Sequence, residues 1–318
     1  MDRGQDCAWI IVMTDDKARF DLVGRVAARL AHGTSGVEPD SNSPSSPPDQ
    51  IAAHRATDQP TSSDDTEPAG TAVVTGAGGA QVELDFASLH KEGFLTPYNQ
   101  KSQIAEEFRI LKRPLLRIAF DSRKANNGIG HVIMVTSSRP EDGKTFISTN
   151  LAFSMASERD LFVLLIDADI RRVGLSKKLG VEDRPGIMDV LINPALSISD
   201  VMIRTNVPNL AIIPAGRSND TSTEMFASQR MTKLVRDISS RYKDRLIIFD
   251  APPVLAASEP GVLAQHVGQI LFVVRSGSTS KRSVAEALRL VDACPDLNFV
   301  INRMPLGTGG DRFGAYDY

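Results

Sequence analysis

One short loop in the sequence has the residues that a phosphate-binding site needs. The segment SSRPEDGKT (137–145) ends in the triplet Gly143-Lys144-Thr145. In loops of this kind, backbone N–H groups and the start of a helix present partial positive charge to phosphate oxygens. The lysine reaches the β and γ phosphates, and the threonine hydroxyl contributes to a Mg²⁺ site. The segment therefore predicts a nucleotide site, with ATP and Mg²⁺ as its ligands.

Three aspartates follow two apolar runs further along the chain. Asp167 and Asp169 end the run in LFVLLIDADIRR (161–172). Asp250 ends the run in RLIIFDAPP (245–253). Carboxylate oxygens are hard ligands that suit Mg²⁺, and a second carboxylate can accept a proton from an attacking hydroxyl. One aspartate at a strand end is often only a helix cap. Three on two strands, with a phosphate loop on another, favour a catalytic role.

The elements that must hold these residues follow from the spacing of apolar residues. HVIMVTS (131–137) reads as a strand and 143–158 as a helix, so the loop joins a strand to a helix. A second helix is predicted over 103–120, and further strands are predicted at 161–166, 209–213, 245–250, 269–274 and 297–301. This alternation predicts an α/β fold, a P-loop NTPase with a mainly parallel β-sheet covered by helices on both faces. Ligands bind such sheets at the C-terminal ends of the strands, where the acids lie.

Composition limits the classes of protein that fit. The chain has 318 residues, 42% of them hydrophobic, with a net charge of −3 and a pI near 6.0. The absence of a basic excess argues against nucleic acid as a partner. Cys7 and Cys294 show no metal-type spacing, which indicates a reduced, cytoplasmic chain. No apolar run reaches the roughly 18 residues that a membrane span needs.

The chain divides into four segments. Residues 1–32 form a short N-terminal segment, 33–80 a disordered linker, 81–304 the P-loop domain and 305–318 a flexible tail with tyrosines. The linker is rich in Ser, Pro, Asp and Thr and cannot bury enough apolar surface to offset its ordering entropy.

The N-terminal segment holds two apolar stretches. DLVGRVAARLAHG (21–33) places its apolar residues on one stripe with arginines beside it, which predicts a small amphipathic helix. Such a helix could dock on a partner, touch an anionic membrane surface or be a marginal helix at a frayed terminus. CAWIIVM (7–13) is too short for a signal peptide core, and we interpret it as an upstream extension with Met13 as the functional start.

The order PEDGKT, LLIDADIRR, IIFDAPP resembles the Walker A, Walker A′ and Walker B series of the bacterial tyrosine kinase family, the autokinases of capsule and exopolysaccharide synthesis. The resemblance covers about residues 84–303 and is closest to the cytoplasmic, exosortase-associated branch. It implies an ATP-dependent protein-tyrosine autokinase that regulates exopolysaccharide polymerisation or export. It also implies ring-type self-association, a membrane partner of the chain-length-determinant (polysaccharide co-polymerase) type, a phosphotyrosine phosphatase, and a cytoplasmic location at the inner face of the membrane through the partner.

The resemblance assigns roles to individual residues of this sequence. It implies that Lys144, Asp167 and Asp169 are catalytic and that Thr145, Asp167 and Asp250 hold the metal. The tail residues Tyr316 and Tyr318 would be the phosphoacceptors, phosphorylated in trans. Oligomer contacts would come from Glu106, Arg109 and Lys112, with lysine where the family has a second arginine. The nucleotide would be held by the loop and the end of the last strand, namely Ser138, Arg139, Pro140, Glu141, Asp142, Gly143, Lys144, Thr145, Phe146, Asn302 and Arg303.

The loop departs from the family at two acidic positions. The family usually has glycine at Glu141, and a left-handed conformation there would cost roughly 1–2 kcal/mol, or about tenfold in nucleotide affinity. Asp142 is expected to cap the following helix and to point away from the phosphates. Two alternatives stay open: a partition or division ATPase, against which Arg139 stands where that class has lysine, and a weakly active nucleotide-binding regulator of a polysaccharide export complex.

Overall fold

The fold is described from a computed structural model. It describes residues 8–13, 80–120, 128–217, 222–226, 228–242 and 244–304. The predicted amphipathic helix, all of the predicted linker except residue 80, and the tail with Tyr316 and Tyr318 lie outside the described residues.

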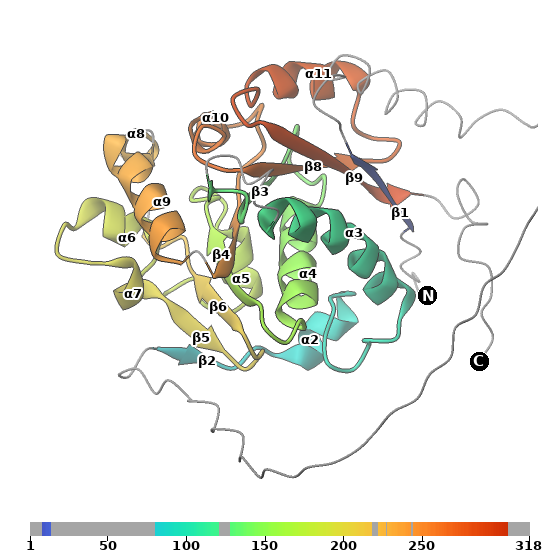
Figure 1. Cartoon of the computed structure of the whole chain (residues 1–318), viewed down its shortest axis with the longest axis horizontal. Helices are drawn as coiled ribbons and strands as arrows, with labels where there is room; N and C mark the ends of the chain where they lie inside the picture. Colours follow the sequence, from blue (N-terminus) through green and yellow to red (C-terminus); the bar gives the residue numbers. More distant parts are fainter. Residues whose placement is uncertain are drawn as a thin grey trace, which may run out of the picture. The chain divides into compact units, whose positions relative to one another are not determined.

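The described residues form one sheet of nine strands (Figure 1). Two of the eight pairings are antiparallel, β1 with β9 and β5 with β6, and the other six are parallel. The predicted fold, a mainly parallel sheet, is confirmed. In spatial order the strands are β1 (Ala8–Met13), β9 (Asp296–Met304), β8 (Gln269–Arg275), β3 (Val132–Ser137), β7 (Arg245–Asp250), β4 (Phe162–Asp167), β6 (Leu210–Ile213), β5 (Ile203–Thr205) and β2 (Gln81–Val82).

Three strands were not predicted from the sequence. β1 comes from the stretch that we interpreted as an upstream extension, and it adds an edge strand antiparallel to β9. β2 and β5 contain two and three residues, which is too short for a period-two pattern to emerge. The other six strands agree with the predicted ranges to within three residues at each end.

Side chains of the central strands alternate between two apolar cores, one on each face of the sheet. Val132 and Met134 of β3 join one core, while Ile133 and Val135 join the other. Because strand side chains alternate in direction, an apolar run can only be buried on both sides when helices cover both faces. The Val132 face is covered by α6 (Ile187–Ile192), α7 (Ile198–Val201), α8 (Ser222–Phe226), α9 (Gln229–Arg241), α10 (Glu259–Leu263) and α11 (Lys281–Arg289).

The Ile133 face is covered by helices from the first half of the domain. They are α2 (Phe86–Lys91), α3 (Gln103–Phe120), α4 (Lys144–Ala156) and α5 (Gly174–Lys178). α3 and α4 lie side by side in front of the sheet in Figure 1. Among the helices that the structure describes, none is long and apolar enough to cross a membrane.

Strand register brings the chemical residues to one edge of the sheet. In the parallel pairing of β4 with β7, Asp167 lies opposite Asp250. In the pairing of β3 with β7, Val135 lies opposite Asp250, so the loop after β3 starts just beyond the same level. The carboxylates and the phosphate loop therefore meet because parallel strands end together.

The predicted contact residues of α3 divide between an exposed pair and a buried lysine. Glu106 and Arg109 form an ion pair on the surface, and Arg109 Nη2 donates to the carbonyl of Gln100 at 2.7 Å. Lys112 Nζ instead donates to the carbonyl of Ser154 at 2.8 Å and pairs with Glu158 at 2.7 Å. Its side chain is only 8% exposed.

Lys112 therefore ties α3 to the end of α4, and we remove it from the predicted oligomer contacts. Glu106 and Arg109 lie on the surface, and their role in assembly stays a prediction.

We expect Lys112→Met to lower the free energy of unfolding by about 1–2 kcal/mol, because the Ser154 carbonyl loses its charged donor. Arg109→Met is the matched control on the same helix, and loss of its exposed pair should cost less than about 0.5 kcal/mol. Urea unfolding of both variants measures the difference. Equal losses in the two variants would contradict the internal role of Lys112.

Candidate nucleotide and catalytic site

The phosphate loop is braced from behind by the segment that follows β7. Thr136 Oγ1 donates to the carbonyl of Pro252 at 2.7 Å, and Val254 N donates to the carbonyl of Ser137 at 2.8 Å. Gly143 ends the loop with φ +98°, and a Cβ at this position would lie 1.8 Å from Nδ2 of Asn302. Both its backbone conformation and this close approach require glycine.

Asp142 does not cap α4, which corrects the expectation from the sequence. The N-cap residue of α4 is Gly143, without a side-chain cap. The carboxylate of Asp142 is buried and accepts hydrogen bonds from Arg139 N at 3.0 Å and Thr279 Oγ1 at 2.7 Å. Asn302 Nδ2 donates to the Asp142 carbonyl at 2.7 Å. Asp142 thus fastens the loop to the segment after β8 and to the end of β9.

Glu141 has the strained backbone conformation that the sequence raised as a concern. Its φ is +68°, in the left-handed region that a residue with a Cβ adopts at a cost of roughly 1–2 kcal/mol. It is exposed and lines the cavity at the loop. The loop therefore has a left-handed backbone conformation at position 141 although this residue is not glycine.

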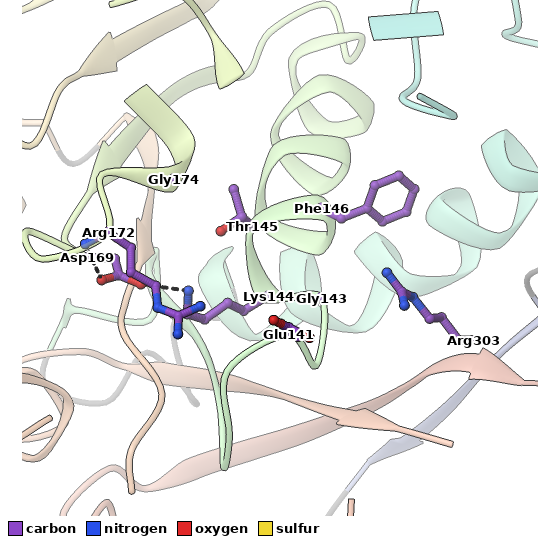
Figure 2. Close-up of a pocket in the computed structure, with 9 residues that line it drawn as sticks. All are labelled: Glu141, Gly143, Lys144, Thr145, Phe146, Asp169, Arg172, Gly174 and Arg303. Atoms are coloured by element: carbon purple, nitrogen blue, oxygen red, sulfur yellow. Dashed lines mark hydrogen bonds and ion pairs between the residues drawn. The ribbon is translucent and has the colours of Figure 1, made fainter. Parts of the chain in front are cut away.

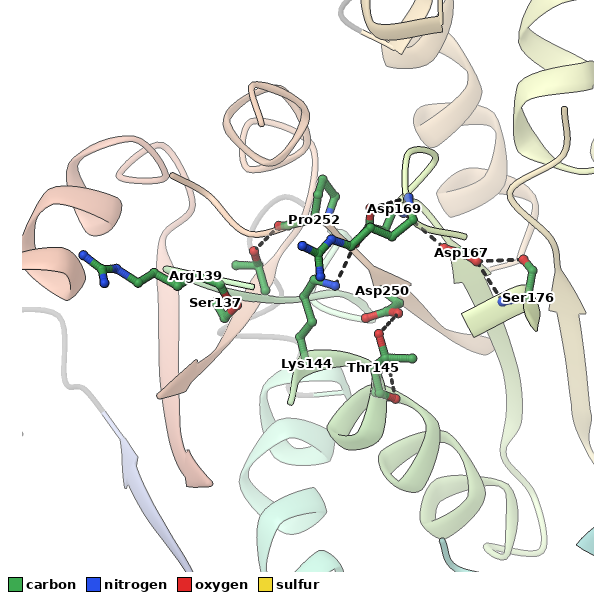
Figure 3. A network of polar contacts seen from close by, with 12 residues as sticks. Ser137, Arg139, Lys144, Thr145, Asp167, Asp169, Ser176, Asp250 and Pro252 are labelled. Atoms are coloured by element: carbon green, nitrogen blue, oxygen red, sulfur yellow. Dashed lines mark hydrogen bonds and ion pairs between the residues drawn. The ribbon is translucent and has the colours of Figure 1, made fainter. Parts of the chain in front are cut away.

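The acids and the loop are joined by direct hydrogen bonds (Figure 3). Lys144 Nζ donates to Asp169 Oδ2 at 2.7 Å, and Thr145 Oγ1 donates to Asp250 Oδ2 at 2.8 Å. The predicted loop lysine, loop threonine and strand-end acids thus form one cluster, as the sequence indicated.

Asp167 is held more tightly than its two neighbours. Its Oδ2 accepts from both the backbone N and the Oγ of Ser176, at 2.8 and 2.7 Å. Its Oδ1 accepts from Asp169 N at 3.1 Å. Both oxygens of this fully buried carboxylate therefore have donors, and Asp167 fixes the turn that presents Asp169.

Burial and mutual repulsion change the acidity of the cluster. Burial, with the nearby charge of Asp250, raises the pKa of Asp167 to about 7. Burial also raises the pKa of Asp250 to about 6, although Lys144 opposes the shift. Burial lowers the pKa of Lys144, but the carboxylates around it outweigh that effect, so its pKa lies above the usual value. Clustered pKa shifts of this kind in a cleft are typical of functional sites.

An open cavity of about 340 Å³ lies over the loop (Figure 2). Its predicted lining residues are Glu141, Gly143, Lys144, Thr145, Phe146, Asp169 and Arg303, joined by the unpredicted Arg172 and Gly174. Phe146 also packs on Phe94 with ring centroids 4.9 Å apart.

Seven of the residues predicted to hold the nucleotide or metal or to act in catalysis do not line this cavity: Ser138, Arg139, Pro140, Asp142, Asn302, Asp167 and Asp250. Asn302 and Asp142 support the loop from behind, and Arg139 points away from Lys144 (Figure 3). Arg172 was missed although it stands only three residues after Asp169 in DADIRR, which was the available signal.

The residues present fit a nucleotide with Mg²⁺. Asp250 Oδ1 is buried without a hydrogen-bond partner, beside the Thr145 hydroxyl. A hard cation would satisfy this oxygen. In the described part of the chain, no three His, Cys, Asp or Glu side chains are grouped to enclose a metal by themselves. Mg²⁺ commonly takes one or two carboxylates and completes its shell with phosphates and water.

We expect Glu141→Gly to raise the free energy of unfolding by about 1–2 kcal/mol, because the ligand-free loop already holds Glu141 in the left-handed conformation and glycine adopts it without strain. Glu141→Ala is the control, since it removes the carboxylate and keeps the Cβ. Urea unfolding measures both variants. If alanine gains as much as glycine, the carboxylate and not backbone strain destabilises the loop.

We expect the stability of the ligand-free protein to fall as pH rises from about 4 to about 7. Unfolded aspartates titrate near 3.9, whereas Asp167 and Asp250 hold their protons to about 7 and about 6 when folded. The folded state therefore binds more protons in this window, and raising the pH favours unfolding. Urea unfolding in EDTA at a series of pH values measures the slope.

Asp250→Asn should flatten this slope, because it removes one of the two carboxyl groups whose pKa is raised in the folded state. Asp244→Asn, at an exposed position before β7, is the control for removing a carboxylate away from the site. An unchanged slope in Asp250→Asn would show that Asp250 does not hold a proton in this range.

Comparison with known proteins places this geometry in a family. Residues 130–293, 164 of 318, match the family described as AAA domain. The tyrosine-protein kinase Ptk of Acinetobacter johnsonii is 32% identical over 209 residues, which are 65% of this chain and only 27% of Ptk. The tyrosine-protein kinase YwqD of Bacillus subtilis is 27% identical over 194 residues, 61% of this chain and 78% of YwqD.

A solved structure agrees with these sequence matches. The kinase domain of the Escherichia coli tyrosine kinase ETK aligns with a TM-score of 0.55 and 28% identity, covering 76% of this chain and 93% of that domain. The sequence matches and the structural match thus agree on the same class of relatives. The chain belongs to the AAA domain family, and the relatives that it resembles are named bacterial tyrosine-protein kinases.

Proposed function

We propose that this chain is an ATP-dependent protein-tyrosine autokinase that regulates exopolysaccharide polymerisation or export. The observation that carries the proposal is the joining of Lys144 and Thr145 to Asp169 and Asp250 at one open cavity, in a chain whose relatives are named tyrosine-protein kinases. The acceptors would be Tyr316 and Tyr318 in the tail of another copy.

Lys144 would change partners when ATP binds. Without a ligand it pairs with Asp169 at 2.7 Å. The β and γ phosphates carry more negative charge than one carboxylate, so the ammonium group would turn to them and release Asp169. Nucleotide binding would then free the base for catalysis.

Of the two aspartates at the end of β4, Asp169 is the better candidate for the catalytic base. It lines the cavity, whereas Asp167 is buried behind it with donors on both oxygens. In the transfer, the tyrosine oxygen would form a bond to the γ phosphorus while the bond from that phosphorus to the bridging oxygen breaks. The phenolic proton would pass to Asp169, and the bond's electron pair would leave with ADP.

The metal would be held by Thr145 and Asp250, with Asp167 behind them, the set predicted from the sequence. Bound Mg²⁺ would neutralise phosphate charge during the transfer. The unpartnered Asp250 Oδ1 supports this assignment.

Assembly and partner follow from the family resemblance. Glu106 and Arg109, exposed on α3, would contact the next copy of a ring. A membrane protein of the chain-length-determinant type would recruit the chain to the inner face of the membrane, and a phosphotyrosine phosphatase would reset it. Each phosphotyrosine adds about −1.5 to −2 charges beside an acidic site, which would favour release of the neighbouring copy.

A weakly active regulator is the second candidate, and the strained Glu141 favours it. A loop that binds nucleotide weakly could still drive assembly through occupancy alone. The partition-type ATPase has less support, because Arg139 does not line the cavity.

We expect Lys144→Ala to lose ATP-dependent phosphorylation of its own tail, because the main cation for the phosphates is gone. Mixed with a chain truncated after residue 304, it should gain phosphotyrosine at Tyr316 or Tyr318, since the truncated copy keeps the site. Mass spectrometry of the mixture detects transfer in trans. No label in the mixture, with wild type active, excludes transfer in trans, and an inactive wild type favours the regulator.

A further inference from the structure

Two adjacent arginines follow the aspartate pair, and the structure gives them different surroundings. Arg171 Nε lies 3.6 Å from Glu259 Oε1, and the Glu259 side chain is fully buried. Neither Glu259 oxygen accepts a hydrogen bond. Arg171 is thus held by a buried carboxylate on α10, away from the cavity. Arg172 lines the cavity together with Lys144 and Asp169.

The backbone of Arg172 is held in a closed turn beside Asp169. Its N–H donates to the Asp169 carbonyl at 3.2 Å and lies 3.3 Å from Asp169 Oδ1. Val173 follows in the left-handed conformation, with φ +53°, and its N–H donates to the same carbonyl at 2.8 Å. From this turn the Arg172 side chain extends toward the end of Lys144 (Figure 2).

The charges around the cavity favour a further cation for a triphosphate. Of the two arginines that line it, Arg172 lies on the side of Asp169 and Lys144, whereas Arg303 lies beyond Gly143 on the opposite side (Figure 2). Three aspartates and the cavity-lining Glu141 face a single buried lysine. Lys144 is already paired with Asp169 before any ligand arrives. A triphosphate adds negative charge that Mg²⁺ and one lysine neutralise only in part, and the charge on the γ-phosphoryl oxygens is what phosphoryl-transfer sites must stabilise.

We propose that Arg172 binds the γ-phosphoryl oxygens of the nucleoside triphosphate from within the same chain. A planar guanidinium can donate two parallel hydrogen bonds to a phosphoryl group, which a lysine cannot do. Arg172 then distinguishes a triphosphate from a diphosphate and stabilises the transferring group. The inference rests on the nucleotide site of the proposed function and goes beyond it, because it assigns the γ-phosphate contact.

The test compares two nucleotides in three proteins. Titration calorimetry with Mg²⁺ gives the dissociation constants of a non-hydrolysable ATP analogue and of ADP for wild type, Arg172→Ala and Arg171→Ala. In Arg172→Ala we expect analogue affinity to fall tenfold or more, with ADP affinity within about twofold of wild type, because only the analogue has a γ-phosphate.

Arg171→Ala is the matched control, and its ratio of analogue to ADP affinity should equal that of wild type. Urea unfolding confirms that each variant is folded. An equal loss for both nucleotides in Arg172→Ala, or no loss, overturns the inference, as does a wild type that binds neither. A wild type that binds the analogue through Arg172 but forms no phosphotyrosine leaves the inference intact and removes the kinase proposal.

Discussion

The rest of the site depends on the burial of three carboxylates at one edge of the sheet. Asp167, Asp169 and Asp250 are almost completely shielded from water, and like charges at such close range repel strongly where water is scarce. Lys144, the Thr145 hydroxyl and the Ser176 donors each offset part of this repulsion. The cluster is therefore a poor stabiliser of the fold and a ready receptor for cations and phosphate. The raised pKa values of Asp167 and Asp250 have the same cause, the burial of neighbouring carboxyl groups.

The phosphate loop also contains negative charge, from two acidic residues at positions close to the nucleotide site. A glycine-rich loop would bring no charged side chain close to a polyphosphate, whereas this loop contains the acidic residues Glu141 and Asp142. The Asp142 carboxylate is turned inward to donors from Arg139 and Thr279, so its charge serves the fold. Glu141 has no such partner among the contacts described and keeps a left-handed backbone at the cavity. One acid strengthens the loop, and the other weakens its fit to an anion.

The sequence was most informative where local pattern and chemistry coincide. Runs such as 245–250 were recognised because burial on both faces makes a parallel strand apolar throughout, and the acids at their ends marked the site. Residues whose roles depend on tertiary contacts were misjudged. Lys112 was read from its family position, yet the end of α4 lies over it. Asp142 was read as a cap because its partner Thr279 lies 137 residues away. Arg172 was overlooked because its position near Asp169 in the sequence does not by itself show that its side chain lines the cavity.

The end of β9 also sets a limit on distance within any assembly. Asn302 braces the phosphate loop, and β9 ends two residues later at Met304. Tyr316 follows Met304 by 12 residues, so even a fully extended chain carries its hydroxyl no further than about 40–50 Å from that strand end. A neighbouring copy that receives this tyrosine must present its cavity inside that radius. The covalent length of the chain after β9 thus restricts which ring geometries, and how many copies, are compatible with transfer between neighbours.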